Sequence, residues 1–194
     1  MNKKIEIEIP EGKVAEWKEI NGVTTLVLVD EVDKRPVTER IKTFEDACNE
    51  LGEENVLVQA YRTAEFNTSG NQNDVSDVVA YLKLRVIAEA LNEGWEPHFT
   101  TDEYRWYPWF YLYTQEEIDK MDEEKKKKLW LFGGSSSNGA NCGLASATSY
   151  DAWSYSHSSF SARLAVKSEA LAKYFGQQFI DIWADYITLP RKEE

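Results

Sequence analysis

Apolar and polar residues alternate along the first thirty positions of the chain. Isoleucines alternate with glutamates over residues 5–9, and this period of two predicts a half-buried strand that ends at Pro10. The β-branched run 23–29, preceded by an Asn-Gly turn dipeptide, predicts a hairpin over residues 14–30. We therefore expect an N-terminal β arm over residues 1–34, which either forms a small sheet of its own or docks onto a larger assembly.

Helical periodicity replaces this alternation in the middle of the chain. Thr43 with Asp46 forms a capping-box pattern, Gly52 is placed to end the helix that it opens, and a second short helix is expected over 56–66. The longest expected helix covers 75–93. Its apolar residues recur at helical spacing and predict one broad buried face: Val75, Val78, Val79, Leu82, Val86, Ala90 and Leu91. Residues 35–93 are thus predicted to form a helical scaffold, with Lys83, Arg85 and Glu89 on the solvated side of the long helix.

Aromatic residues dominate the segment that follows. Residues 94–113 contain four Tyr, three Trp and two Phe, and two prolines confine the segment to irregular pieces, with extended structure around 109–113. A second capping-box pattern at Thr114 predicts a short helix.

The C-terminal third is expected to return to the core. Short strands are predicted over 129–132 and 160–166, and one long helix is expected to run from the cap Ser168 to about Ile187. The fold class is therefore α+β: an N-terminal β-hairpin arm, a helical middle, and a C-terminal β unit over 94–194 closed by a long helix.

Charge and cysteine content exclude several classes of protein. The chain has 34 acidic and 22 basic residues and a formal charge of −12, which argues against a nucleic-acid partner. It has neither an apolar run of eighteen residues nor the apolar core of a signal peptide, so we expect synthesis in the cytoplasm and no membrane association. Cys48 and Cys142 are the only cysteines, and neither has a partner at metal-ligand spacing, so no metal and no cofactor are expected.

The stretch 133–162 differs from the rest of the chain. It carries one formal charge, Asp151, in a chain whose charged fraction is 29%. Small hydroxyl, amide and glycine residues mixed with aromatic rings are typical of binding loops, whereas a solvated linker would not carry the rings. We read 133–162 as one displayed loop, and the residues predicted to bind are Asn138, Asn141, Ser149, Tyr150, Asp151, Trp153, Tyr155 and His157. A second interpretation is that its small residues pack against identical copies of the chain.

Residue usage in the same stretch suggests how it arose. Residues 133–162 contain no Lys, Glu, Gln or Met, and every residue type except Trp153 can be reached from an asparagine codon by changes in the first two bases. Adenine-directed diversification would leave this signature. A diversified binding face is therefore a hypothesis for this stretch.

Catalytic motifs are missing from the sequence. The two histidines, His98 and His157, have no recognisable nucleophile motif around them, and the pair Asp102-Glu103 fits the opening of a turn. We therefore expect a protein that is not an enzyme. The alternative is a carbohydrate-acting enzyme or a sugar-binding module that uses the aromatic segment 94–113, since a glycosidase needs only two carboxylates and exposed rings stack on sugars.

Four segments carry a resemblance to known proteins: EALNEGWEPHF, YRWYPWFYLY, LFGGSSSNGANCGLA and SARLAVKSEALAKYFGQQFIDIWADY. Together they resemble a family of gut Bacteroidales proteins and their phages that includes virion proteins of crAss-like phages. The GG turn, the Ser/Asn/Tyr-rich stretch and the following S-x-R-L-A are also similar to the C-type-lectin-like variable domains altered by diversity-generating retroelements. That second resemblance implies ligand display on a rigid β scaffold at 133–163. The usual G-F-R ending appears here as Ser161-Ala162-Arg163.

These resemblances imply a location and partners. We expect a virion protein that is structural or receptor-binding, such as a head or tail fibre component. It would associate with itself as a homo-oligomer, for example a trimer, with other virion proteins, and with a glycan or protein receptor on the host surface.

Overall fold

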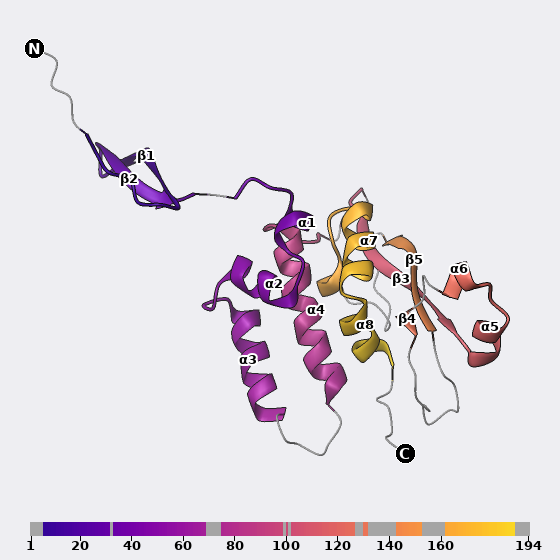
Figure 1. Cartoon of the computed structure of the whole chain (residues 1–194). Coiled ribbons are helices and arrows are strands. Elements are labelled where there is room, and N and C mark those ends of the chain that lie inside the picture. Colours follow the sequence, from indigo (N-terminus) through magenta and orange to yellow (C-terminus); the bar gives the residue numbers. More distant parts are fainter. Residues whose placement is uncertain are drawn as a thin grey trace, which may run out of the picture. The chain divides into compact units, whose positions relative to one another are not determined.

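The computed structural model describes the following parts of the chain: residues 6–31, 33–68, 75–98, 100, 102–126, 130–131, 143–152 and 162–188. The chain divides into two compact units, Met1–Pro36 and Val37–Glu194. Helices and strands are mixed, and the first unit holds a two-stranded antiparallel sheet (Figure 1). The α+β class and the N-terminal hairpin are thus confirmed.

The first unit is a hairpin of β1 (Lys13–Ile20) and β2 (Val23–Asp30). Its turn residues Asn21 and Gly22 both have positive φ, 52° and 75°, which is the conformation that an Asn-Gly hairpin turn requires. The strand predicted over 5–9 is wrong for its described residues, because 6–9 belong to no strand. In the part of the chain that the structure describes, no strand pairs with them.

The second unit begins with four helices: α1 (Val37–Arg40), α2 (Phe44–Leu51), α3 (Val56–Thr68) and α4 (Ser76–Asn92). The predicted capping box before α2 is present. The Asp46 backbone N–H donates to Thr43 Oγ1 at 3.1 Å, and the Thr43 N–H donates to Asp46 Oδ2 at 2.8 Å. Gly52 ends the helix with a positive φ of 81°, as the sequence predicted.

Helix α4 is the central packing element, but its buried face is wider than the one predicted. It packs against α2 and α3 as well as against α7 and α8. Val78, expected on the buried face, is exposed, whereas Leu84 and Ile87 are fully buried. The prediction missed Leu84 and Ile87 because a single-face pattern assumes one neighbouring layer, whereas α4 has neighbours on more than one side.

A three-stranded antiparallel sheet follows, in the order β3-β5-β4. Its strands are β3 (Arg105–Tyr113), β4 (Trp130–Leu131) and β5 (Gly143–Ala152), and the short helices α5 (Gln115–Asp119) and α6 (Glu123–Lys126) lie between β3 and β4 in the chain. The capping box predicted at Thr114 is present at the start of α5. The interpretation of 133–162 as one loop is wrong, because ten of its residues form the central strand β5. This strand pairs with β3 on one side and with β4 on the other.

Two further predictions near the C-terminus need correction. The strand expected over 160–166 is, in its described residues, the 3₁₀ turn η1 (Ala162–Leu164) and a single bridge between Val166 and Trp106. The long final helix is two helices, α7 (Glu169–Gln178) and α8 (Ile180–Ile187). The break lies at Phe179, where φ is −116° and ψ is 33°. The predicted cap is present, because Ser168 Oγ accepts from the Leu171 N–H at 3.3 Å.

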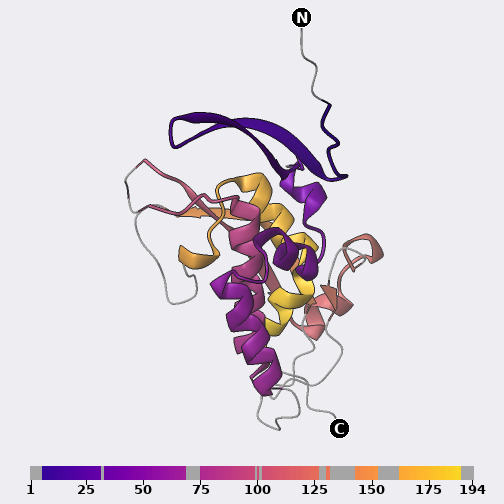
Figure 2. The same cartoon turned by 90° about the vertical axis from the view of Figure 1, so that its left-hand side faces the viewer.

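Helices α3, α4, α7 and α8 form layers on one side of the β3–β5 ladder. In Figure 1, α3 and α4 run antiparallel, and α7 with α8 lies between α4 and the β3–β5 ladder. When α3 and α4 face the viewer, α7 and α8 lie behind them (Figure 2). None of the helices in the described part of the chain is long and apolar enough to cross a lipid bilayer.

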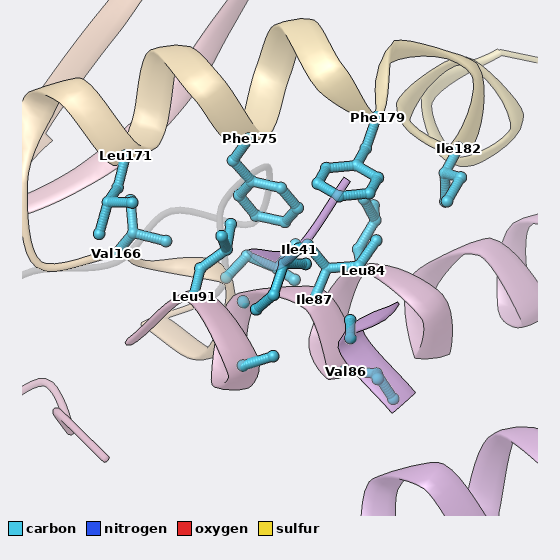
Figure 3. Close-up of a cluster of buried hydrophobic side chains, with 14 of the residues drawn as sticks. Ile41, Leu84, Val86, Ile87, Leu91, Val166, Leu171, Phe175, Phe179 and Ile182 are labelled. Carbon is cyan, nitrogen blue, oxygen red and sulfur yellow. The ribbon is translucent and has the colours of Figure 1, made fainter. Parts of the chain in front are cut away.

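The main core fills the space between α4 and the last two helices. Figure 3 shows Leu171, Phe175 and Phe179 of α7 and its C-cap pointing toward α4, where they meet Leu84, Ile87 and Leu91 around Ile41. The Phe175 ring also makes an edge contact with Trp183 of α8, with centroids 5.0 Å apart. The break at Phe179 therefore lets residues of both helices share one core. Trp106 and Phe110 of β3 pack against this core.

Candidate binding site

Alternate residues of β3 point to opposite sides of the sheet. Trp106 and Phe110 pack against the main core, and the Phe110 ring lies 5.3 Å from the Trp183 ring. Because side chains alternate along a strand, the odd-numbered residues point away from the helices. We call Tyr107, Trp109, Tyr111 and Tyr113 the aromatic face.

The middle of the aromatic face is accessible to solvent. Tyr111 is 52% exposed and Trp109 is 38% exposed. The rings of Tyr111 and Tyr113 lie side by side, with centroids 6.1 Å apart and planes inclined by 34°. Large rings on one face of a strand bury much apolar area when they contact a ligand.

The neighbouring strand β5 pairs with β3 along the aromatic face. In the strand register, Trp109 lies opposite Thr148, Tyr111 opposite Ala145, and Tyr113 opposite Gly143. The register shifts between Trp109 and Phe110, which is the mark of a β-bulge in β5. The exposed rings of β3 therefore lie along a strand whose residues opposite them are Thr148, Ala145 and Gly143.

One end of the aromatic face is closed by a second, smaller core. Tyr107 is buried with Ala165, and Trp95 packs against them. Arg105, at the start of β3, is fully buried. Burial raises the pKa of the Tyr107 phenol, and the positive charge of the nearby Arg105 offsets part of that rise. Because its pKa is raised, the Tyr107 phenol is neutral at neutral pH.

A cavity of about 670 Å³ opens beside Trp95. Its wall contains two cationic and two anionic side chains: Arg85, Arg163, Glu89 and Glu96. The sequence predicted a solvated Arg85, but its side chain is only partly exposed, and its Nε has no hydrogen-bond partner among the described residues. Mixed donors and acceptors of this kind suit a neutral polar ligand, because hydroxyl groups accept from guanidinium and donate to carboxylate.

Asn92 positions the segment that closes this end of the site. Its Nδ2 donates to the Ala165 carbonyl at 2.8 Å, and its Oδ1 accepts from the Lys167 N–H at 3.1 Å. Lys167 in turn pairs with Glu93, Nζ to Oε2 at 2.7 Å, and this contact lowers the pKa of the Glu93 carboxyl. Sequence reasoning missed Asn92, because an asparagine before a helix-ending glycine resembles an ordinary helix end.

The eight residues predicted to bind from the sequence do not gather in one described place. Ser149, Tyr150 and Asp151 lie in β5, where the strand register places Tyr150 opposite Tyr107, and Ser149 and Asp151 opposite Pro108 and Trp106. Only Tyr150 therefore shares the register of the aromatic face. The other five lie outside the described residues: Asn138, Asn141, Trp153, Tyr155 and His157.

Strand β5 also divides the predicted loop. Residues 132–142 precede β5, which begins at Gly143, and residues 153–161 follow it after Ala152. The two ends of a ten-residue strand lie about 30 Å apart. Asn138 and Asn141 thus belong to the segment attached at one end, and Trp153, Tyr155 and His157 to the segment attached at the other.

Of the residues considered for catalysis, Glu103 has a structural role, and His157 lies outside the described residues. The Glu103 carboxylate accepts from the His98 backbone N–H at 2.5 Å, so it holds the turn before β3, and Asp102 is exposed. In the described residues, no group of three or more His, Cys, Asp or Glu side chains lies close enough to hold a metal ion.

Comparisons with protein-family models, with curated proteins and with solved structures found no match.

Proposed function

We propose that the protein is a non-enzymatic, receptor-binding component of a phage virion and that it binds a surface glycan through the aromatic face. The observation that carries the binding role is the exposure of Trp109 and Tyr111 on one face of a strand whose other face is packed against the core. The virion setting rests on the resemblance of the sequence to phage virion proteins.

A glycan suits this surface for two physical reasons. Flat rings present apolar faces that stack against the C–H faces of sugars, while the flanking hydroxyl groups remain solvated. Next to Trp95 at the closed end of the face, the mixed charges of Arg85 and Glu89 offer donors and acceptors to sugar hydroxyls. A negative formal charge of −12 disfavours polyanions, so the proposed ligand is a neutral glycan.

The scaffold is suited to binding without rearrangement. Phe110 and Trp106 anchor β3 to the core on the opposite side of the sheet, and Val166 bonds its backbone to Trp106 in both directions, at 2.9 and 3.1 Å. A site built on a held strand loses little conformational entropy when it binds. The rings proposed to bind the glycan thus belong to a strand that is packed against the core on its other face.

We also propose that this unit displays loops in the manner of a lectin-like domain. The segments 132–142 and 153–161 leave the two ends of β5, which lies beside the aromatic face. We infer that these segments tune specificity while the aromatic face supplies general affinity for sugars. A diversified sequence in 133–162 would then change which glycan is preferred.

An array of immobilised glycans tests the binding role. The wild-type chain is expected to bind neutral hexose polymers more strongly than sulfated or sialylated ones. The double variant Trp109→Ala/Tyr111→Ala is expected to lose most of this signal. The control Phe66→Ala removes another exposed ring, 82% exposed on α3, and is expected to bind like the wild type. Binding to no glycan, or equal loss in the control, contradicts the proposal.

A further inference from the structure

The N-terminal hairpin exposes apolar residues that a stable sheet would cover. None of the described residues in the first unit is buried, and Trp17 is 71% exposed. Ile20, Val23 and Leu28 are also exposed. A two-stranded hairpin is only marginally stable in water, and three or more strands are needed for independent stability. We therefore expect further strands to pair with the hairpin.

The edge of β1 that faces away from β2 has a defined hydrogen-bonding phase. The Glu31 N–H donates to the Gly12 carbonyl at 2.9 Å, and β1 pairs with β2 in continuous register from Lys13–Asp30 to Ile20–Val23. In an antiparallel ladder only every second residue exchanges both backbone bonds with the opposite strand. The even-numbered residues of β1 thus bond β2, and Ala15, Trp17 and Glu19 direct their N–H and C=O groups toward the other edge. No strand pairs with that edge in the described part of the chain.

The charges of β1 match those of a second copy in one register. When two β1 strands pair antiparallel about a two-fold axis at Trp17, Glu16 lies opposite Lys18 of the second copy, and Lys18 lies opposite its Glu16. The same register places Val14 opposite Ile20 of the second copy. It also forms backbone bonds through Ala15, Trp17 and Glu19, whose N–H and C=O groups point to that edge.

Neighbouring registers lack this match. The two nearest registers that keep the hydrogen-bonding phase bring Glu16 against Glu16 or Lys18 against Lys18 of the second copy, and like charges directly opposite one another are destabilising. Pairing between two β2 strands would have no register selected by charge, because β2 has no charged side chain from Val23 to Val29. The charge pattern therefore selects both the edge and the register.

We propose that the protein forms a two-fold dimer in which the β1 strands of two copies pair antiparallel about Trp17, giving a four-stranded sheet in the order β2-β1-β1-β2. The closed two-fold arrangement uses each β1 edge once, so it ends at two copies. Dimerisation also brings two aromatic faces into one particle, and such bivalency raises the apparent affinity for a repeating surface ligand. The evidence for the dimer comes from β1 alone and does not depend on glycan binding.

Sedimentation equilibrium of the full chain tests the dimer. The wild type is expected to have twice the chain mass of 22.3 kDa. Lys18→Glu places Glu opposite Glu, and Glu16→Lys places Lys opposite Lys, twice in each dimer. Each variant alone is expected to raise the dimer dissociation constant about tenfold or more. An equal mixture of the two variants restores both opposite-charge pairs, so the dimer mass is expected to return.

The control is Lys125→Glu, which makes the same change in net charge on α6 in the other unit. It is expected to dimerise like the wild type. A monomeric wild type, for example one in which the hairpin is covered within its own chain, overturns the proposal. A trimeric mass overturns it as well, as does a mixture that stays monomeric or a Lys18→Glu variant that dimerises normally.

Discussion

The side-chain amide of Asn92 bridges the end of α4 to the segment before α7, donating to the Ala165 carbonyl and accepting from the Lys167 N–H. The residue between them, Val166, exchanges two backbone hydrogen bonds with Trp106 of β3. One buried asparagine thus couples the helical layer to the strand that carries the aromatic face.

Replacement of Asn92 by Ala is expected to destabilise the second unit by about 1–3 kcal/mol. The substitution leaves a buried carbonyl and an N–H without their partner, and this loss is larger than that of an exposed hydrogen bond. Denaturant unfolding measures the change. Asn67→Ala, on the exposed side of α3, is the control and is expected to stay within about 0.5 kcal/mol of the wild type.

The Asp46 carboxylate accepts from the backbone N–H groups of Lys42 and Thr43, and these bonds lower the pKa of Asp46. An acid whose pKa is lowered in the folded state stabilises the fold above its unfolded pKa of about 3.9, and that contribution is lost as pH falls through the folded value. Asp46→Asn is therefore expected to cost about 1 kcal/mol near neutral pH. Thermal unfolding across pH should show this difference shrinking below about pH 4. A difference that is constant with pH would contradict the assignment.

Local signals in the sequence were sufficient for the turns and helix ends. The capping boxes at Thr43 and Thr114, the Asn-Gly turn and the end at Gly52 are all present, because each depends on residues within a few positions of one another. Features that depend on distant partners were predicted less well.

Strand β5 illustrates the limit. Its residues have low strand propensity, and they form a strand by pairing chiefly with β3, whose residues lie thirty or more positions earlier. The sequence singled out the aromatic segment and the small-residue stretch separately, but it gave no sign that they lie side by side. The break at Phe179 was missed for the same reason, since it follows from the packing of α7 and α8 against one core.

Cys48 is a buried free thiol, and burial raises its pKa to about 11. The thiolate is the reactive form, so in a Cys142→Ser background we expect a thiol-reactive dye to label Cys48 at pH 8 only after denaturant is added. Rapid labelling of the native protein would show that α2 opens readily, in contrast to the packing around Cys48 in the core.

The proposed dimer axis predicts a specific cross-link. Only at the two-fold axis do identical residues face each other, so Trp17→Cys is expected to form an intermolecular disulfide on mild oxidation. Ile20→Cys is the matched control, because in the proposed register it faces Val14 of the second copy rather than itself. Equal cross-linking of both variants would place the axis elsewhere.

The most direct test of the account is the affinity of Tyr111→Ala for the neutral glycan that the array selects, measured by calorimetry beside the wild type and Tyr111→Phe. Stacking on an exposed ring predicts a loss of about tenfold in the alanine variant. It also predicts nearly full affinity in the phenylalanine variant, which keeps the ring. An alanine variant that binds as tightly as the wild type would contradict the assignment of the aromatic face as the binding surface.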